Sequence, residues 1–93
     1  ILFPPSLTYI CQMSFEECNA LKQIQIPDSV RLIESNAFCN CNSLAYVKIA
    51  SQLTEVQRNV FYACSSLTQI DVPSSISKFD TTGINSNVKI IKF

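Results

Sequence analysis

Hydrophobic residues recur along the chain with a period of 23 residues. Units 4–26, 27–49 and 50–72 align without a gap, and a shorter unit, 73–93, follows them after a two-residue deletion. Residues 1–3 align with the end of a unit. Such a period predicts one solenoid domain over the whole chain, because stacked units bury a continuous core that a single unit could not bury alone.

Six positions of each unit are apolar throughout, and the positions between them vary freely among residues such as lysine, glutamine, threonine, aspartate, tyrosine and alanine. Side chains at the six positions are expected to face inward and to form ladders through the stack. The six columns are Leu7, Val30, Leu53 and Ile76; Ile10, Ile33, Val56 and Phe79; Phe15, Phe38, Phe61 and Ile84; Leu21, Leu44, Leu67 and Val88; Ile24, Val47, Ile70 and Ile91; and Ile26, Ile49, Val72 and Phe93.

Each unit ends in apolar alternation with period 2, as in 44–49, and this alternation predicts a strand. These strands must run parallel, about 4.8 Å apart, since every unit follows the same path. A second short extended piece is expected at 29–33, and 35–38 has room for only one helical or 3₁₀ turn. The predicted fold is an α/β-type or mostly-β solenoid. Its main strands are expected near 1–3, 24–26, 46–49, 69–72 and 88–93.

The repeat resembles the BspA-type (Treponema-type) class of 23-residue leucine-rich repeats, L-x-x-I-x-I-P-x-S-[VL]-x-x-I-x-x-x-A-F-x-x-C-x-x-L. The second unit carries most of the motif, and the last keeps little beyond the proline, the serine and the apolar ladder. The matching positions in the second unit are Pro27, Ser29, Val30, Ile33, Ala37, Phe38, Cys41, Leu44, Val47 and Ile49.

The resemblance implies a horseshoe arc with one parallel concave sheet and short strands or 3₁₀ turns on the convex side. It also implies a non-catalytic protein interaction module, at the cell surface or secreted, that acts in adhesion or recognition. A structural scaffold or spacer inside a larger, cytoplasmic or cytoskeletal assembly is the alternative function.

The five cysteines fall into three columns of the repeat. Cys18, Cys41 and Cys64 share one column, three residues after the phenylalanine column, and are predicted to be buried, reduced thiols that bond backbone carbonyls. Cys39 and Cys11 align with charged residues, so both are expected to be at least partly exposed. A zinc site needs about four converging ligands, and the chain has no histidine. We predict no metal site and no cofactor.

Charge and composition narrow the function further. Seven basic and seven acidic residues cancel, which argues against nucleic acid as a partner, and the apolar runs are too short for membrane insertion. With no histidine and a single glycine, the chain offers neither an imidazole base nor a glycine-rich phosphate loop. We therefore predict a protein that is not an enzyme and whose partner is a protein.

The outward positions of the predicted strands form the candidate binding face. Tyr46 is the best single anchor, because tyrosine is enriched at energetic hot spots. Lys48, Asp71 and Lys92 share a column, so an alternative role for them is to pair across neighbouring strands and keep the sheet soluble. The candidate face comprises Gln23, Gln25, Tyr46, Lys48, Gln69, Asp71, Ile90 and Lys92.

The two ends of the repeat pattern differ. The last unit, 73–93, has Gly83 and Ile84 where other units have an Ala-Phe pair or a close variant, and it lacks the column cysteine. Such decay is typical of terminal repeats, so this unit is expected to close the solenoid. The pattern at 1–3 shows no decay, and further repeats or a partner are expected at the N-terminal edge.

Overall fold

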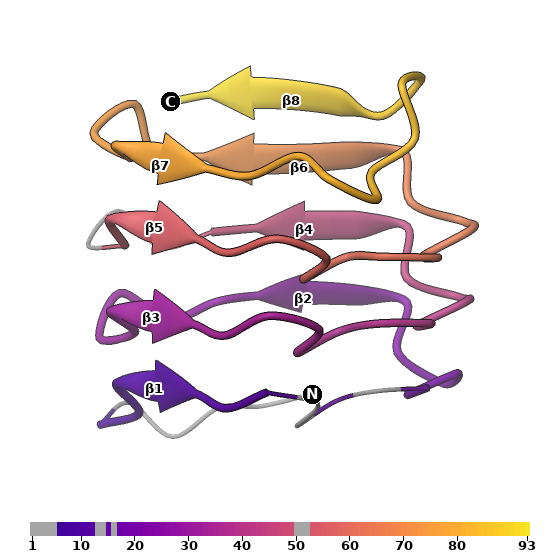
Figure 1. The fold of residues 1–93 in the computed structure, drawn as a ribbon, viewed down its shortest axis with the longest axis horizontal. Coiled ribbons are helices and arrows are strands. Elements are labelled where there is room, and N and C mark those ends of the chain that lie inside the picture. Colours follow the sequence, from indigo (N-terminus) through magenta and orange to yellow (C-terminus); the bar gives the residue numbers. More distant parts are fainter. Residues whose placement is uncertain (1–5, 13–14, 16, 50–52) are drawn as a thin grey trace.

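The chain winds as a parallel β-solenoid in the computed structural model, which describes residues 6–12, 15, 17–49 and 53–93. Each coil contributes one strand to each of two four-stranded sheets, and the strands of the two sheets point in opposite directions (Figure 1). The long-strand sheet contains β2 (Gln23–Gln25), β4 (Tyr46–Lys48), β6 (Gln69–Val72) and β8 (Lys89–Lys92). The short-strand sheet contains β1 (Tyr9–Ile10), β3 (Leu32–Ile33), β5 (Glu55–Val56) and β7 (Lys78–Phe79).

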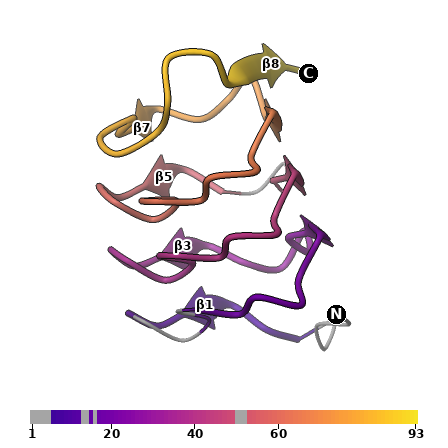
Figure 2. The same ribbon diagram turned by 90° about the vertical axis from the view of Figure 1, so that its right-hand side faces the viewer.

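Every strand pair is parallel, which confirms the predicted architecture. In Figure 2 each coil forms one layer, and successive layers lie one above another. Where a helical or 3₁₀ turn was expected, at 35–38, the chain forms hydrogen-bonded turns, and the described residues contain no helix. The strand predicted at 1–3 lies outside the described residues.

The pairing register follows the 23-residue repeat in the first three coils. Gln23 pairs with Tyr46, and Tyr46 pairs with Gln69, so residues one period apart are neighbours in the long-strand sheet. The same offset joins Tyr9 to Leu32 in the short-strand sheet. The sequence columns are therefore the physical ladders of the molecule.

Strand β8 departs from the predicted register by one residue. Ile90 pairs with Ile70, whereas the sequence alignment placed Ile91 beside Ile70 and Ile90 on the solvent face. A slip of one residue reverses the facing of a whole strand. The prediction was wrong here because Ile90 and Ile91 are adjacent, so hydrophobicity alone does not choose which of them faces inward.

The same slip corrects two further assignments at the C-terminus. Lys92 pairs with Val72, an inward position, and not with Asp71. Phe93 follows β8, and half of its surface is exposed (50%), although its column was predicted to face inward. The Phe93 N–H donates to the Val72 oxygen (2.9 Å), and the Ser74 N–H donates to the Phe93 oxygen (2.8 Å), so the backbone of this end is held in the observed register.

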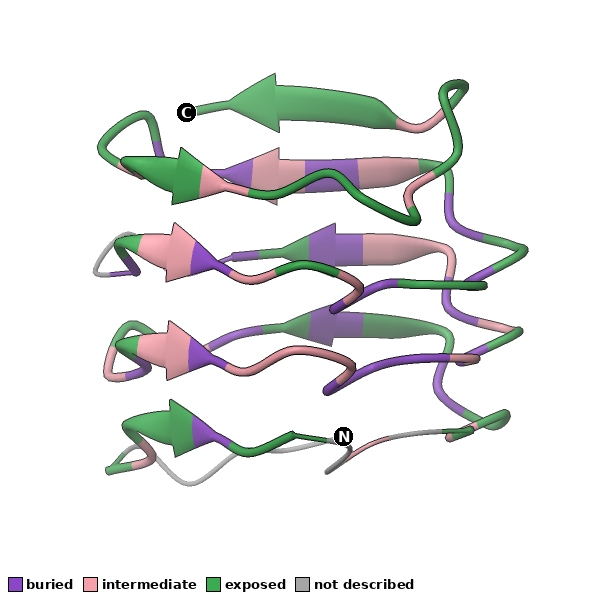
Figure 3. Ribbon diagram, in the orientation of Figure 1, coloured by how far each residue is buried: buried purple, intermediate pink, exposed green. Residues whose placement is uncertain are grey.

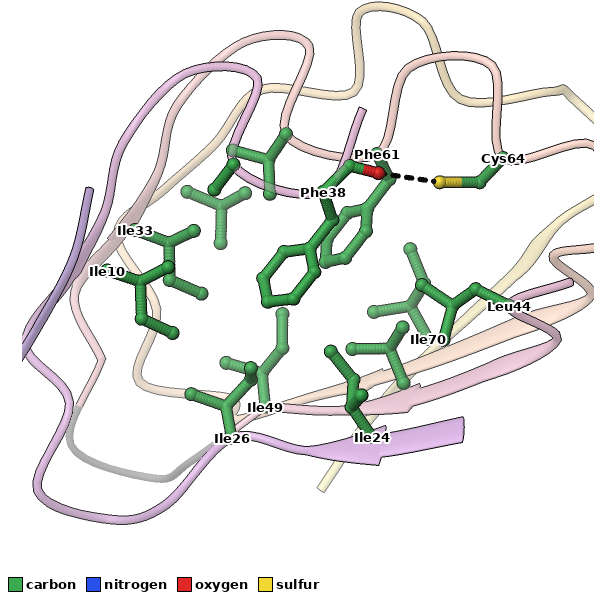
Figure 4. Packing of buried hydrophobic residues seen from close by; sticks show 14 of the residues in the cluster. Ile10, Ile24, Ile26, Ile33, Phe38, Leu44, Ile49, Phe61, Cys64 and Ile70 are labelled. Atoms are coloured by element: carbon green, nitrogen blue, oxygen red, sulfur yellow. Dashed lines mark hydrogen bonds between the residues drawn. The ribbon is translucent and has the colours of Figure 1, made fainter. Parts of the chain in front are cut away.

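A stack of aromatic rings runs through the core. The ring of Phe38 lies 5.1 Å from that of Phe15 and 5.7 Å from that of Phe61, with interplanar angles of 6° and 13°. Phe38 and Phe61 are fully buried at the centre of the cluster (Figure 4), and Phe15 is partly buried. Buried residues recur in the strands of the middle coils, while all of β8 is exposed (Figure 3). The predicted phenylalanine ladder is confirmed for these three residues.

A turn position shared by the first three coils has a left-handed backbone. Glu17, Asn40 and Ala63 occupy equivalent places, with φ of 60°, 63° and 59°. Apart from asparagine and aspartate, residues with a Cβ rarely adopt this conformation, because Cβ crowds the following carbonyl oxygen. The middle coil therefore carries the residue best suited to this turn.

Replacing Ala63 by asparagine should raise the free energy of unfolding by about 0.5–1 kcal/mol. The Ala63 side chain is exposed, so the larger amide has room. Urea denaturation checks the change, with Ala45→Asn as the control, since Ala45 has no positive φ. A gain at both positions, or at neither, would contradict this explanation of the turn.

Candidate functional site

The outward side chains of the long-strand sheet form two straight rows. Gln23, Tyr46 and Gln69 are paired in one row, and Gln25, Lys48 and Asp71 are paired in the other. The residue between the rows in each strand is buried. The structure thus brings together six of the eight residues proposed for the binding face.

The other two proposed residues are displaced by the register of β8. The rows continue with Lys89 and Ile91, which pair with Gln69 and Asp71. Ile90 and Lys92 occupy inward positions of the ladder, although both are exposed because β8 is the last strand of its sheet. Sequence analysis therefore missed Lys89 and Ile91 as members of the face.

A hydrogen-bonded network crosses the centre of this face. The Tyr46 hydroxyl donates to Oδ2 of Asp71, and Nε2 of Gln69 donates to Oδ1 of the same carboxylate (2.7 Å). These two hydrogen bonds, with a smaller contribution from the positive charge of Lys48, hold the pKa of Asp71 below its usual value. The same hydrogen bond to Asp71 raises the pKa of Tyr46. Asp71 is thus an ionised acceptor that fixes the predicted anchor, Tyr46, in one orientation.

Replacing Tyr46 by phenylalanine should raise the pKa of Asp71 toward its usual value. The hydroxyl stabilises the charged form of the carboxylate, so the pKa of Asp71 is lower in the folded protein than in the unfolded chain. The hydrogen bond therefore contributes to stability at pH values above the unfolded pKa. This contribution is lost as the pH falls through the folded pKa. Titration of the carboxyl carbon by NMR checks the shift. Gln12→Ala, in the turn after β1 of the other sheet, is the control, and an unchanged pKa of Asp71 in Tyr46→Phe would contradict the role of the hydroxyl.

Lys48 contacts an aromatic ring at the C-terminal end of the face. Its Nζ lies 5.5 Å from the centroid of the Phe93 ring, a cation–π distance. The predicted pairing of Lys48, Asp71 and Lys92 across the sheet is replaced by this contact and by the network around Asp71. Phe93 was missed as a surface residue because its column was expected to face inward.

A hollow of about 310 Å³ lies beside β2 and β4. It is lined by Gln23, Ile24, Gln25 and Tyr46. The lining amides and the aromatic ring carry no formal charge, so this part of the face offers hydrogen bonds and a ring surface to a ligand.

The column cysteines bond backbone carbonyls of the preceding coil. Sγ of Cys41 donates to the Phe15 oxygen (3.1 Å), and Sγ of Cys64 donates to the Phe38 oxygen (3.2 Å), the bond drawn in Figure 4. Burial raises the pKa of Cys41, and it raises the pKa of Cys64 to about 12. The predicted burial is confirmed for these two thiols, while Cys18, in the first complete unit, is only partly buried.

The prediction that Cys39 is accessible was wrong. Its side chain is 7% exposed, whereas Tyr62, at the equivalent position of the next coil, is 50% exposed. The Glu17 N–H donates to the Cys39 oxygen, and the Asn40 N–H donates to the Tyr62 oxygen, so the turn of Cys39 lies between two hydrogen-bonded turns. A short side chain is covered there, while a long one reaches solvent. Cys11 is exposed, as predicted.

Side-chain acceptors on the short-strand side were also missed. Oε1 of Glu34 accepts from the Gln12 N–H (3.0 Å), and Oε1 of Gln57 accepts from the Ser35 N–H (2.9 Å). Glu34 and Gln57 are one period apart, so each satisfies a backbone donor of the coil below. A glutamate or glutamine in one column of consecutive units is the sequence signal for this bond.

The described part of the chain contains no cluster of histidine, cysteine, aspartate or glutamate side chains with the geometry of a metal site. Its segments likewise include no helix with the length and apolar character that crossing a membrane requires.

The family comparison agrees with the observed coils. The family model described as a BspA type leucine rich repeat region (6 copies) matches residues 1–93. Searches among curated proteins and among solved structures found no match for the chain.

Proposed function

Because the chain belongs to the BspA type leucine-rich repeat family, we propose that it is a non-catalytic protein interaction module that recognises its partner through the outward face of the long-strand sheet. Repeats of this family often take part in protein interactions. The observation that carries the proposal is the regular register of β2, β4 and β6, which places six polar or aromatic side chains in two rows.

The network on the face favours recognition because it lowers the cost of binding. Tyr46, Gln69 and Asp71 hold one another in place before any partner arrives. Immobilising long side chains opposes association, so a face that is already ordered loses less entropy when it binds. Tyr46 also keeps partial exposure, which leaves its ring available to a partner.

A photo-crosslinking residue tests which face binds. Placed at Gln25, on the long-strand sheet, it should capture a partner from a mixture of proteins from the natural surroundings of this chain. The control places the same residue at Arg58, an exposed position in the turn after β5. Capture from Arg58 alone would overturn the assignment of the face.

The identity of the captured protein separates adhesion from the alternative role. A partner from another cell or from an extracellular matrix supports adhesion or recognition. A partner that belongs to the same permanent assembly supports a scaffold or spacer role, in which the face contacts a fixed neighbour.

A further inference from the structure

We propose that the C-terminal half of the long-strand sheet face binds an acidic, extended segment of a partner protein, with an apolar side chain between its carboxylates. The proposal rests on the function proposed above and specifies the chemistry of the partner. Its receiving surface, called here the lysine patch, is formed by Lys48, Lys89, Ile91 and Phe93.

Charge is distributed unevenly over a chain that is neutral as a whole. The long-strand sheet, together with Lys22 at its entrance, carries one aspartate, Asp71, and four exposed lysines. Lys22 belongs to this ladder because its oxygen accepts from the Ala45 N–H (2.8 Å). These lysines are Lys22, Lys48, Lys89 and Lys92.

The remaining described residues have the opposite balance. They carry three basic and five acidic side chains, so their net charge is opposite in sign to that of the long-strand sheet. The basic residues are Arg31, Arg58 and Lys78, and the acidic residues are Glu17, Asp28, Glu34, Glu55 and Asp80. Complementary potentials select partners and speed their encounter, and the partner of the long-strand sheet should therefore be acidic.

The single carboxylate of the face is already occupied by internal hydrogen bonds. Both oxygens of Asp71 accept from side chains of its own sheet, those of Tyr46 and Gln69. Within the described part of the chain, Lys89 forms no ion pair, so its charge is available to a carboxylate of a partner.

Exposed apolar surface lies among these lysines. Ile91 is 44% exposed beside Asp71, and Phe93 is 50% exposed with its ring against Lys48. Exposed apolar side chains next to lysines suit a protein segment in which acidic and apolar residues alternate. A nucleic acid draws most of its affinity from many phosphate contacts, which two lysines do not supply.

The experiment uses three synthetic peptides and the intact protein. The first peptide carries glutamates on both sides of a central leucine, the second has lysine in place of each glutamate, and the third has serine in place of the leucine. We expect the first to bind, as measured by fluorescence anisotropy, the second not to bind, and the third to bind more weakly. Binding of the first should weaken as salt is raised, because exposed charges are screened.

Two variants locate the binding site. Reversing charge at the patch with Lys89→Glu should weaken binding of the first peptide by about tenfold or more. The matched control, Lys78→Glu, reverses an exposed strand lysine of the same coil on the short-strand sheet and should leave affinity unchanged. Circular dichroism confirms that each variant is folded.

Several outcomes would overturn the proposal. They are equal binding of the lysine peptide, equal loss in Lys78→Glu, and no binding of the acidic peptide at millimolar concentration. Stronger binding of single-stranded DNA or of phosphatidylserine vesicles, lost in the same patch variant, would assign the patch to another polyanion. If the peptide fails while crosslinking from Gln25 persists, the acidic partner is excluded and the interaction face stands.

Discussion

Replacing Phe38 by alanine should lower the free energy of unfolding by about 3–5 kcal/mol. Its ring is fully buried and stacks on Phe15 in one neighbouring coil and on Phe61 in the other. Removing it leaves a cavity between layers, and the coils cannot close it because backbone bonds fix their separation. The Phe38 N–H donates to the Val60 oxygen (3.0 Å), and the Phe15 N–H donates to the Ala37 oxygen (2.8 Å).

A loss of this size is a large part of the roughly 5–15 kcal/mol that stabilises a domain of ordinary size. Urea denaturation followed by circular dichroism measures it. The control is Tyr62→Ala, one residue after the Phe61 column position, where the side chain is half exposed. That change should cost less than about 1 kcal/mol. Equal losses from Phe38→Ala and Tyr62→Ala would mean that the stacked rings do not hold the coils together.

The regular part of the fold could be predicted because one signal repeats. In each apolar column, several units indicate independently that the side chain faces inward. An atypical residue in one unit therefore does not change the prediction for that column. The parallel pairing of β4 with β6 follows directly from this repetition. The burial of Phe38 and Cys41 follows in the same way.

The prediction failed where the repeat pattern ends and where the size of a side chain, more than its direction, determines whether it is exposed. In β8, two adjacent isoleucines leave the register open, and the backbone bonds of Phe93 decide it. Cys39 was predicted to be exposed because it shares a column with Glu16 and Tyr62. Its shorter side chain does not reach solvent.

The candidate face shows the same division. Six of its residues follow from the repeat, but the network around Asp71 does not. Whether Tyr46 reaches Asp71 or points to solvent depends on the spacing of neighbouring strands and on rotamers, which a list of columns does not contain. The uneven distribution of charge over the surface could not be predicted from composition either. A net charge of zero says nothing of which sheet each charge lies on.

Cys64 should react with a thiol reagent at pH 8 about a thousandfold more slowly than an ordinary exposed cysteine. Burial is the main reason that its pKa rises from the ordinary 9.0 to about 12, which reduces the reactive thiolate by about that factor. The thiol also donates a hydrogen bond to the Phe38 oxygen, and this bond is lost when the thiol ionises. Cys11 is exposed and serves as the internal reference.

Labelling with iodoacetamide, followed by mass spectrometry of each cysteine peptide, separates the five sites. Cys11 should be modified first and Cys18 next, since Cys18 is partly buried. Cys39 should be slow as well, so only one site, and not the two expected from the columns, is modified quickly. Labelling in concentrated urea is the control and should make all five sites react alike. If Cys64 in the folded protein reacts within about tenfold of the rate of Cys11, its burial and hydrogen bond do not protect it from the reagent. The column of Cys18, Cys41 and Cys64 would then be open to solvent.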